Sequence, residues 1–349
     1  MSNQRTDSPF STSAFFEASP ITSITPGNSS STALDEIATN DIISKAVYVY
    51  GFFAVLGFLP GCFLLYNFIQ LYRAHKRLAW LDVLLWAFCG FQMLLLLLSL
   101  YALAHRPRYM QSTALGCAAL SFTINAASLC GLLVLVLMAY VLSLDPPCDA
   151  LLRKPKVCAA LVSLTSLLMS LLLAGLRGPR DDLQENGDCF VDPVHDGVSY
   201  AASKLCIMFL IPYIVQLGLI ISGCVRQWKS RGRFLSGSKD GPVFLTVSAQ
   251  MFFCLLFYCV VLVRAAQLER KGMLTYHERA FLSVAEFVLF SGSSVSLLLV
   301  LFVHRPCREG LHGAWRQLRD CCQRRGTQPH RNIIAPHIEI TDTLQDIES

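Results

Sequence analysis

Two ionisable side chains, Lys204 and Glu286, lie inside stretches of sequence that are otherwise almost entirely apolar. A charged group in a membrane-spanning helix costs roughly 2.5–3.5 kcal/mol even on the lenient insertion scale, so its presence indicates a function. Two structural alternatives stay open. The two side chains can pair with each other, or each can extend its charged end to the membrane surface.

Uncharged polar residues occur in the same kind of apolar stretch and can add hydrogen bonds to one site. The alternative for each of them is a hydrogen bond that only joins two helices. These candidate binding residues are Asn125, Ser128, Tyr213, Gln216 and Tyr258.

Motifs that mark enzymes are absent from the sequence. It contains no His-Glu-x-x-His, Gly-x-Ser-x-Gly, phosphate-binding loop or dinucleotide fingerprint. The histidines are scattered and lack the spacing of metal ligands. We therefore predict no catalysis, no cofactor and no metal site, and the modest net charge of +5 gives no reason to expect a nucleic-acid partner.

The elements that must position these residues are membrane-spanning helices. Charged residues make up 15% of the chain and hydrophobic residues 54%, whereas a soluble domain carries about 25% charged residues. Each apolar stretch reaches about the ~20 residues that cross a bilayer as a helix. We predict an all-α membrane protein, a seven-transmembrane helix bundle with spans near 46–72, 79–103, 113–143, 155–176, 198–225, 242–267 and 280–304.

Charge placement predicts how the bundle lies in the membrane. The connections after the first, third and fifth spans and the C-terminal tail are rich in Lys and Arg, although Arg106 and Arg108 fall on the opposite side. The positive-inside bias predicts an extracellular N-terminus and a cytoplasmic C-terminus at the plasma membrane. The connection after the fourth span is acidic, with Asp181, Asp182, Glu185, Asp188, Asp192 and Asp196.

The flanking segments complete the predicted organisation. Residues 1–45 are rich in Ser, Thr and Pro and are expected to form a disordered extracellular tail, glycosylated at Asn28 in the sequon Asn28-Ser29-Ser30. No cleavable signal peptide is visible, so the first span is expected to direct insertion. Residues 46–304 form the bundle, 305–322 an amphipathic helix and 323–349 a disordered cytoplasmic tail.

Two of the fourteen cysteines, Cys117 and Cys189, lie on the side predicted to be extracellular. That compartment is oxidising, and these two cysteines have no other partner there, so they are expected to form a disulfide. The bond would join the acidic connection to the start of the third span and contribute about 2–4 kcal/mol.

In the order and spacing of these features, the chain resembles the rhodopsin-like (class A) G-protein-coupled receptors over roughly residues 46–322. The resemblance rests on seven spans, the sequon, Cys117 with Cys189, Asn67 before Lys76-Arg77, Pro212, and an amphipathic segment followed by Cys321-Cys322.

The resemblance implies a ligand cavity lined by the outer halves of spans five and seven, where Lys204 or Glu286 would contact a polar or charged extracellular ligand. It implies palmitoylation of Cys321 and Cys322, contact of the amphipathic helix with membrane lipids, and a heterotrimeric G protein or arrestin as the inner partner.

The chain departs from the family at its switch positions. The third span ends in Val141-Leu142-Ser143 instead of an Asp-Arg-Tyr-type triplet, and Gln92 is the polar residue nearest to the position of the Asp expected in the second span. Further departures are Leu255-Leu256-Phe257-Tyr258 in span six, Ser296-Leu297-Leu298-Leu299-Val300 in span seven, Ile220 in span five, and no Trp in span four.

These observations support a divergent receptor that binds an extracellular ligand and signals through G protein or arrestin. A second hypothesis is a non-signalling seven-helix decoy, trafficking partner or heteromer subunit that has lost the coupling motifs. A transporter or channel is a third hypothesis.

Overall fold

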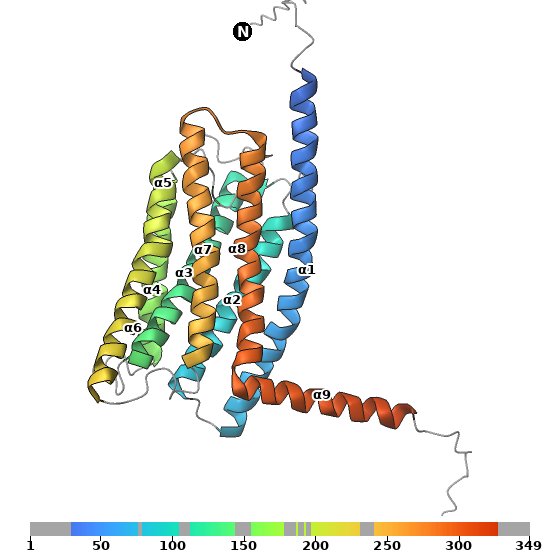
Figure 1. Ribbon diagram of the computed structural model, residues 1–349, viewed down its shortest axis with the longest axis vertical. Coiled ribbons are helices and arrows are strands. Elements are labelled where there is room, and N and C mark those ends of the chain that lie inside the picture. The colour runs from blue at the N-terminus through green and yellow to red at the C-terminus, as the bar shows by residue number, and fades with distance from the viewer. Residues whose placement is uncertain are drawn as a thin grey trace, which may run out of the picture.

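The computed structural model describes residues 29–75, 79–104, 112–143, 155–177, 186–187, 192, 197–230 and 241–326. Seven long helical crossings pack side by side, and a further helix, α9, turns away from one end of the bundle (Figure 1). We call the end of the bundle toward which the start of the first helix lies the N-terminal end, and the other the α9 end.

The crossings follow the predicted order. They are α1 (Ser29–His75), α2 (Trp80–Ala104), α3 (Ala114–Ser143), α4 (Pro155–Leu176), a composite fifth crossing, α7 (Gly241–Arg270) and α8 (Tyr276–Val303). The fifth crossing comprises α5 (Gly197–Lys204), the π-helical segment η2 (Leu205–Leu210) and α6 (Ile211–Ser230). α9 spans Arg305–Gly326.

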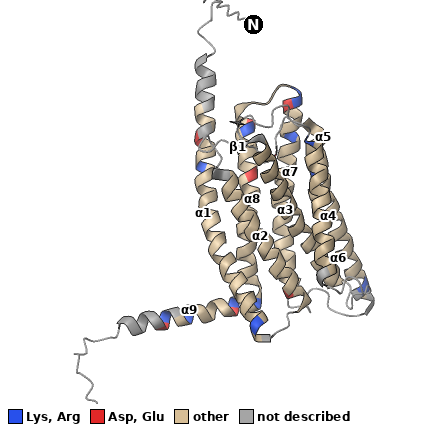
Figure 2. Cartoon of the chain, turned by 180° about the vertical axis from the view of Figure 1, so that it is seen from behind, with Lys and Arg blue, Asp and Glu red and all other residues tan. Residues whose placement is uncertain are grey.

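All seven crossings are long and apolar enough to span a bilayer, so the predicted seven-helix membrane bundle is confirmed. Apolar side chains also cover much of the outer surface, which is favourable only when the surrounding solvent is lipid. The charged residues gather at the two ends of the bundle and along α9 (Figure 2). On α4 the outward-facing leucines include Leu161, Leu164, Leu167, Leu168, Leu171 and Leu172.

The first helix begins at Ser29, well before the predicted start at residue 46. The expectation of a disordered tail over residues 1–45 is therefore wrong for residues 29–45. This stretch contains neither Gly nor Pro, and Lys45 donates to Asp41 one turn earlier at 2.6 Å, a pairing that favours helix. Residues 1–28 lie outside the described part of the chain.

The fifth crossing changes its winding in the turns before Pro212. Proline has no backbone N–H and cannot donate to the carbonyl four residues earlier, which disturbs the regular ladder there. The Ile211 N–H donates instead to the Cys206 carbonyl, five residues back. Such π-helical segments often occur at functional sites, and this one directly follows Lys204.

The junction between α8 and α9 is a buried turn at His304. Its backbone is extended (φ −75°, ψ 113°), which ends α8, and Pro306 suits the first turn of the next helix. The His304 ring lies 3.2 Å from Cys307 Sγ and 3.4 Å from Asp82 Oδ1. Gly310 lies against Asn67, since a Cβ added there would come within 3.2 Å of Asn67 Nδ2.

Close packing of α1 on α8 needs a glycine. A Cβ at position 57 would lie 2.5 Å from the Cβ of Ser294 and 2.6 Å from its Cα, so only Gly57 allows this approach. At the N-terminal end, β1 (Ser112–Thr113) pairs antiparallel with β2 (Asn186–Gly187). The α4–α5 connection therefore runs beside the start of α3.

Candidate functional site

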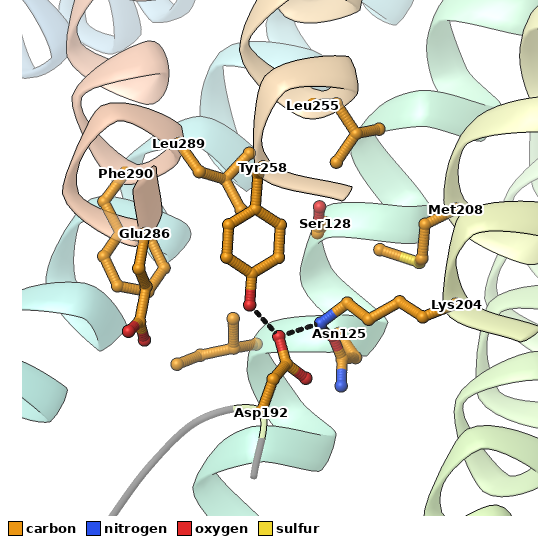
Figure 3. Close-up of a pocket in the computed structure, with 11 residues that line it drawn as sticks. Asn125, Ser128, Asp192, Lys204, Met208, Leu255, Tyr258, Glu286, Leu289 and Phe290 are labelled. Carbon is orange, nitrogen blue, oxygen red and sulfur yellow. Dashed lines mark hydrogen bonds and ion pairs between the residues drawn. The ribbon is translucent and has the colours of Figure 1, made fainter. Parts of the chain in front are cut away.

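A small cavity lies inside the bundle between α3, the fifth crossing, α7 and α8 (Figure 3). The cavity volume is about 20 Å³, which suffices for a single water or a very small group. Its wall comprises Ile124, Asn125, Ser128, Asp192, Lys204, Met208, Leu255, Tyr258, Glu286, Leu289 and Phe290.

The centre of the site is a buried ion pair between Lys204 and Asp192. The two residues are only 2% and 5% exposed, so neither charge reaches bulk solvent. Lys204 Nζ donates to Asp192 Oδ2 and also, at 2.9 Å, to Asn125 Oδ1. Because a buried charge is tolerated only when it is paired and hydrogen-bonded, each of these partners helps to keep Lys204 inside the bundle.

Two tyrosines complete the contacts of the Asp192 carboxylate. Tyr200 donates to Oδ1 at 2.5 Å, and Tyr258 donates to Oδ2. Burial alone would raise the pKa of Asp192, but the Lys204 charge together with hydrogen bonds from Lys204 and both phenols holds it below its ordinary value. The carboxylate therefore stays ionised at neutral pH.

The contacts come from three crossings and one connection. Tyr200 and Lys204 are one turn apart and share a face of α5. Tyr258 lies in α7, and the centroid of its ring is 5.4 Å from Lys204 Nζ. Asn125 lies in α3. Asp192 alone comes from a connection between helices. The cluster thus joins three crossings to the α4–α5 connection.

Glu286 supplies a second buried acid to the same cavity, from α8. It is 6% exposed, and in Figure 3 its carboxylate lies on the other side of the Tyr258 ring from Lys204. Phe290, one turn further along α8, lies beside it (Figure 3). The cavity therefore holds one cationic and two acidic side chains among apolar walls.

Of the seven residues that the sequence singled out for ligand contact, five line this cavity: Lys204, Glu286, Asn125, Ser128 and Tyr258. Tyr213 packs instead against Phe209 and Phe252, with ring centroids 5.2 and 5.1 Å away. Gln216 donates to Ser248. It lies twelve residues beyond Lys204, about 18 Å along the helix, so it is too deep in the bundle to reach the cavity.

Sequence reasoning missed Asp192 and Tyr200. Asp192 was counted only as part of an acidic connection, and Tyr200 was not considered. Two signals in the sequence point to Asp192. A lysine in an apolar span requires a counter-charge, and Asp192 follows Cys189, the residue predicted to be bonded to α3, by three residues. Tyr200 precedes Lys204 by one helical turn, which is the spacing of side chains that meet.

The α9 end of the bundle has a different character. Val141 and Leu142 pack against a buried apolar cluster, and the Ser143 hydroxyl donates to its own helix at Ala139 O, 2.7 Å away. Midway along α2, Gln92 is fully buried, and neither polar atom of its amide has a hydrogen-bond partner among the residues described. Gln250 accepts from Ser296 at 2.7 Å and joins α7 to α8.

The remaining predicted sites are only partly described. Cys117 is disulfide-bonded, but its predicted partner Cys189 lies outside the described residues, as does Asn28. Cys321 and Cys322 lie within α9, and their side chains are not described. Across the described ranges, no group of three His, Cys, Asp or Glu side chains could hold a metal ion.

Comparisons with known proteins leave the family to be argued from the molecule itself. No protein-family model matches the chain, and no curated protein matches it. The resemblance to rhodopsin-like receptors therefore stays a prediction based on the motifs of the sequence.

Proposed function

We propose that this chain is a divergent rhodopsin-like receptor of the plasma membrane, with an extracellular N-terminus and a cytoplasmic C-terminus. The observation that carries the proposal is the cavity near the N-terminal end, where ionisable side chains from several helices converge. Buried ionisable groups in a membrane protein are costly and are usually retained for function. The basic connections support the orientation.

A ligand at this cavity would act by changing the relative stability of two helix arrangements. Asp192 receives hydrogen bonds from Tyr258 on α7 and Tyr200 on α5, so its contacts couple two crossings. A ligand that binds one arrangement more tightly shifts the population toward it. The partners of the cytoplasmic side are a heterotrimeric G protein or arrestin.

Ligand-free signalling in cells tests this proposal. Wild type and Tyr258→Phe are expressed to equal surface density, and activation of each G-protein class and recruitment of arrestin are recorded. Removing the hydroxyl of Tyr258 breaks its hydrogen bond to Asp192 and so one link between α7 and the α4–α5 connection. A lost bond of about 0.6 kcal/mol or more should change basal signalling by at least ~3-fold. Tyr48→Phe, which removes the hydroxyl of an exposed tyrosine on α1, is the matched control. Silence of every class at good surface expression would contradict a signalling role.

Orientation has a separate test. An N-terminal epitope should be accessible to antibody on intact cells, and Asn28→Gln should remove a glycosidase-sensitive shift in electrophoretic mobility. Staining only after permeabilisation would reverse the proposed topology.

A specific observation also favours the second candidate, a non-signalling decoy or partner subunit. The residues at the α9 end of α3, where the family carries an ionisable triplet, are Val141 and Leu142 packed into an apolar cluster. Leu142→Arg distinguishes the two functions. Coupling gained by this variant from a silent wild type would indicate a receptor that has lost its output.

A further inference from the structure

The hydrogen-bond donors around Asp192 could also bind the carboxylate of a free ligand. They are one ammonium group and two phenol hydroxyls, which together donate to both carboxylate oxygens. Charge-assisted hydrogen bonds of this kind are the strong ones in proteins. None of the contacts depends on Asp192 being attached to the chain, so the recognition is of the carboxylate itself.

The donors are held in place without Asp192. Lys204 and Tyr200 lie on α5, Tyr258 on α7, and Lys204 is additionally fixed by Asn125 on α3. Tyr200, Tyr258 and Lys204 are each 2% exposed, so packing restrains their side chains. A site built on rigid helices is preorganised and loses little conformational entropy when an anion binds.

Burial favours an anion at this position. Lys204 cannot reach solvent from its buried place, and an unpaired ammonium in a low-dielectric interior is strongly disfavoured. Removal of the Asp192 carboxylate therefore leaves an ammonium that either loses its proton or is compensated by another anion.

We propose that Lys204, Tyr200 and Tyr258 form a carboxylate-binding site, and that the ligand of this protein is a small monocarboxylate that exchanges with the Asp192 side chain. The inference rests on the proposed receptor function. It deepens that proposal by naming the chemical class that the cavity takes.

The rest of the cavity wall sets the size and charge of that ligand. Ile124, Met208, Leu255 and Leu289 offer apolar surface beside the ion pair. A short aliphatic chain could contact this surface once the Asp192 side chain has left its place. The cavity is small, so a long chain is excluded. Glu286 would repel a second negative charge, so dicarboxylates should bind less well than monocarboxylates of similar length.

Chemical rescue of Asp192→Ala tests the site in the full chain, purified in lipid nanodiscs. This variant keeps the donors but lacks the carboxylate, and we expect its Tm to fall by about 5–15 °C. Acetate or butyrate at tens of millimolar should restore about half of the loss, through preferential binding to the folded state. Acetamide and sodium chloride at matched concentrations should not, and succinate should restore less than butyrate.

Two controls separate site binding from general salt effects. Asp41→Ala removes the carboxylate from an exposed Asp41–Lys45 pair, and acetate should leave its Tm unchanged. The double variant Asp192→Ala/Lys204→Met lacks the cation as well, and acetate should not stabilise it. Rescue of either control to the same extent as Asp192→Ala would overturn the proposal.

Failure of Asp192→Ala to fold would not remove the test. The yield of monodisperse protein is then compared after expression with and without added acetate, and an increase specific to acetate over acetamide supports the site. An absence of rescue in both Tm and yield overturns it. The readout requires no signalling, so a carboxylate site in a silent protein would contradict only the receptor proposal, and a signalling protein without rescue would contradict only the carboxylate proposal.

Discussion

The two halves of the bundle bury polar groups in different ways. Toward the N-terminal end, Lys204, Asp192 and Glu286 share one cavity with two tyrosine hydroxyls nearby. Toward the α9 end, a large apolar cluster fills the space between α1, α2, α3, α7 and α8. Its polar neighbours include the amides Gln92 and Gln250 and the Gln216–Ser248 pair.

This difference indicates which half of the molecule responds to the loss or exchange of a charged partner. A buried ion cluster is sensitive to the loss or exchange of one partner, because the remaining charge is then unpaired. An apolar core with a few amide contacts depends mainly on shape and volume. The half that would receive a ligand is thus electrostatically sensitive, while the half that would transmit a signal is held mainly by apolar packing.

Lys204→Met should produce the largest effect. It leaves the buried Asp192 carboxylate without its cation and should destabilise the protein by about 3–5 kcal/mol. Tm in nanodiscs and surface yield measure this. Lys45→Met is the matched control, because Lys45 pairs with Asp41 on an exposed surface and should cost less than about 1 kcal/mol. Equal effects of the two variants would mean that burial of the ion pair does not matter.

As the pH is lowered, the stability of wild type and that of Lys204→Met should change in opposite directions. The pKa of Asp192 is held below its ordinary value by Lys204, so wild-type stability from this group persists at neutral pH and is lost only below the usual range of an Asp. In Lys204→Met the remaining cause is burial, which raises the pKa. That variant should regain stability as pH falls from about 8 to about 5, because it takes up a proton on folding. Parallel Tm curves for the two proteins would contradict the proposed ion pair.

Gln250→Leu tests the α9 half, where we expect an intermediate effect. Gln250 accepts from Ser296 and donates to Gly292 O at 3.2 Å, so both contacts between α7 and α8 would be lost. The expected cost is about 1–2 kcal/mol. Ser296→Ala, which removes only one of these bonds, should cost about half as much. A loss as large as that of Lys204→Met would show that the two halves do not differ as described.

Gln92→Met should have the smallest effect and the opposite sign. The buried amide lacks hydrogen-bond partners among the described residues, so an apolar side chain of similar length should stabilise the protein by up to about 1 kcal/mol. Gln216→Met is the matched control, since that amide is equally buried but bonded to Ser248, and it should destabilise. Destabilisation by Gln92→Met would indicate a polar partner that the amide requires.

Several features of the site could be predicted from the sequence because they depend on local chemistry. Lys204 and Glu286 stand out as ionisable groups in apolar spans, and both line the cavity. The order of the seven crossings follows from the apolar stretches. The helix α1 starts earlier than expected, because residues 29–45 contain no Gly or Pro to end a helix but are too polar to count as an apolar stretch.

The apolar pattern of the sequence is sufficient to predict a seven-helix membrane bundle. In lipid, an apolar stretch of about 20 residues can satisfy its backbone hydrogen bonds only as a helix or in a closed barrel. Two outcomes required the packed structure: Asp192 is the counter-ion of Lys204, and Tyr213 and Gln216 lie outside the cavity. These outcomes depend on the depth and rotation of each helix and on the position of Asp192 between α4 and α5. Packing between helices distant in the sequence sets all three.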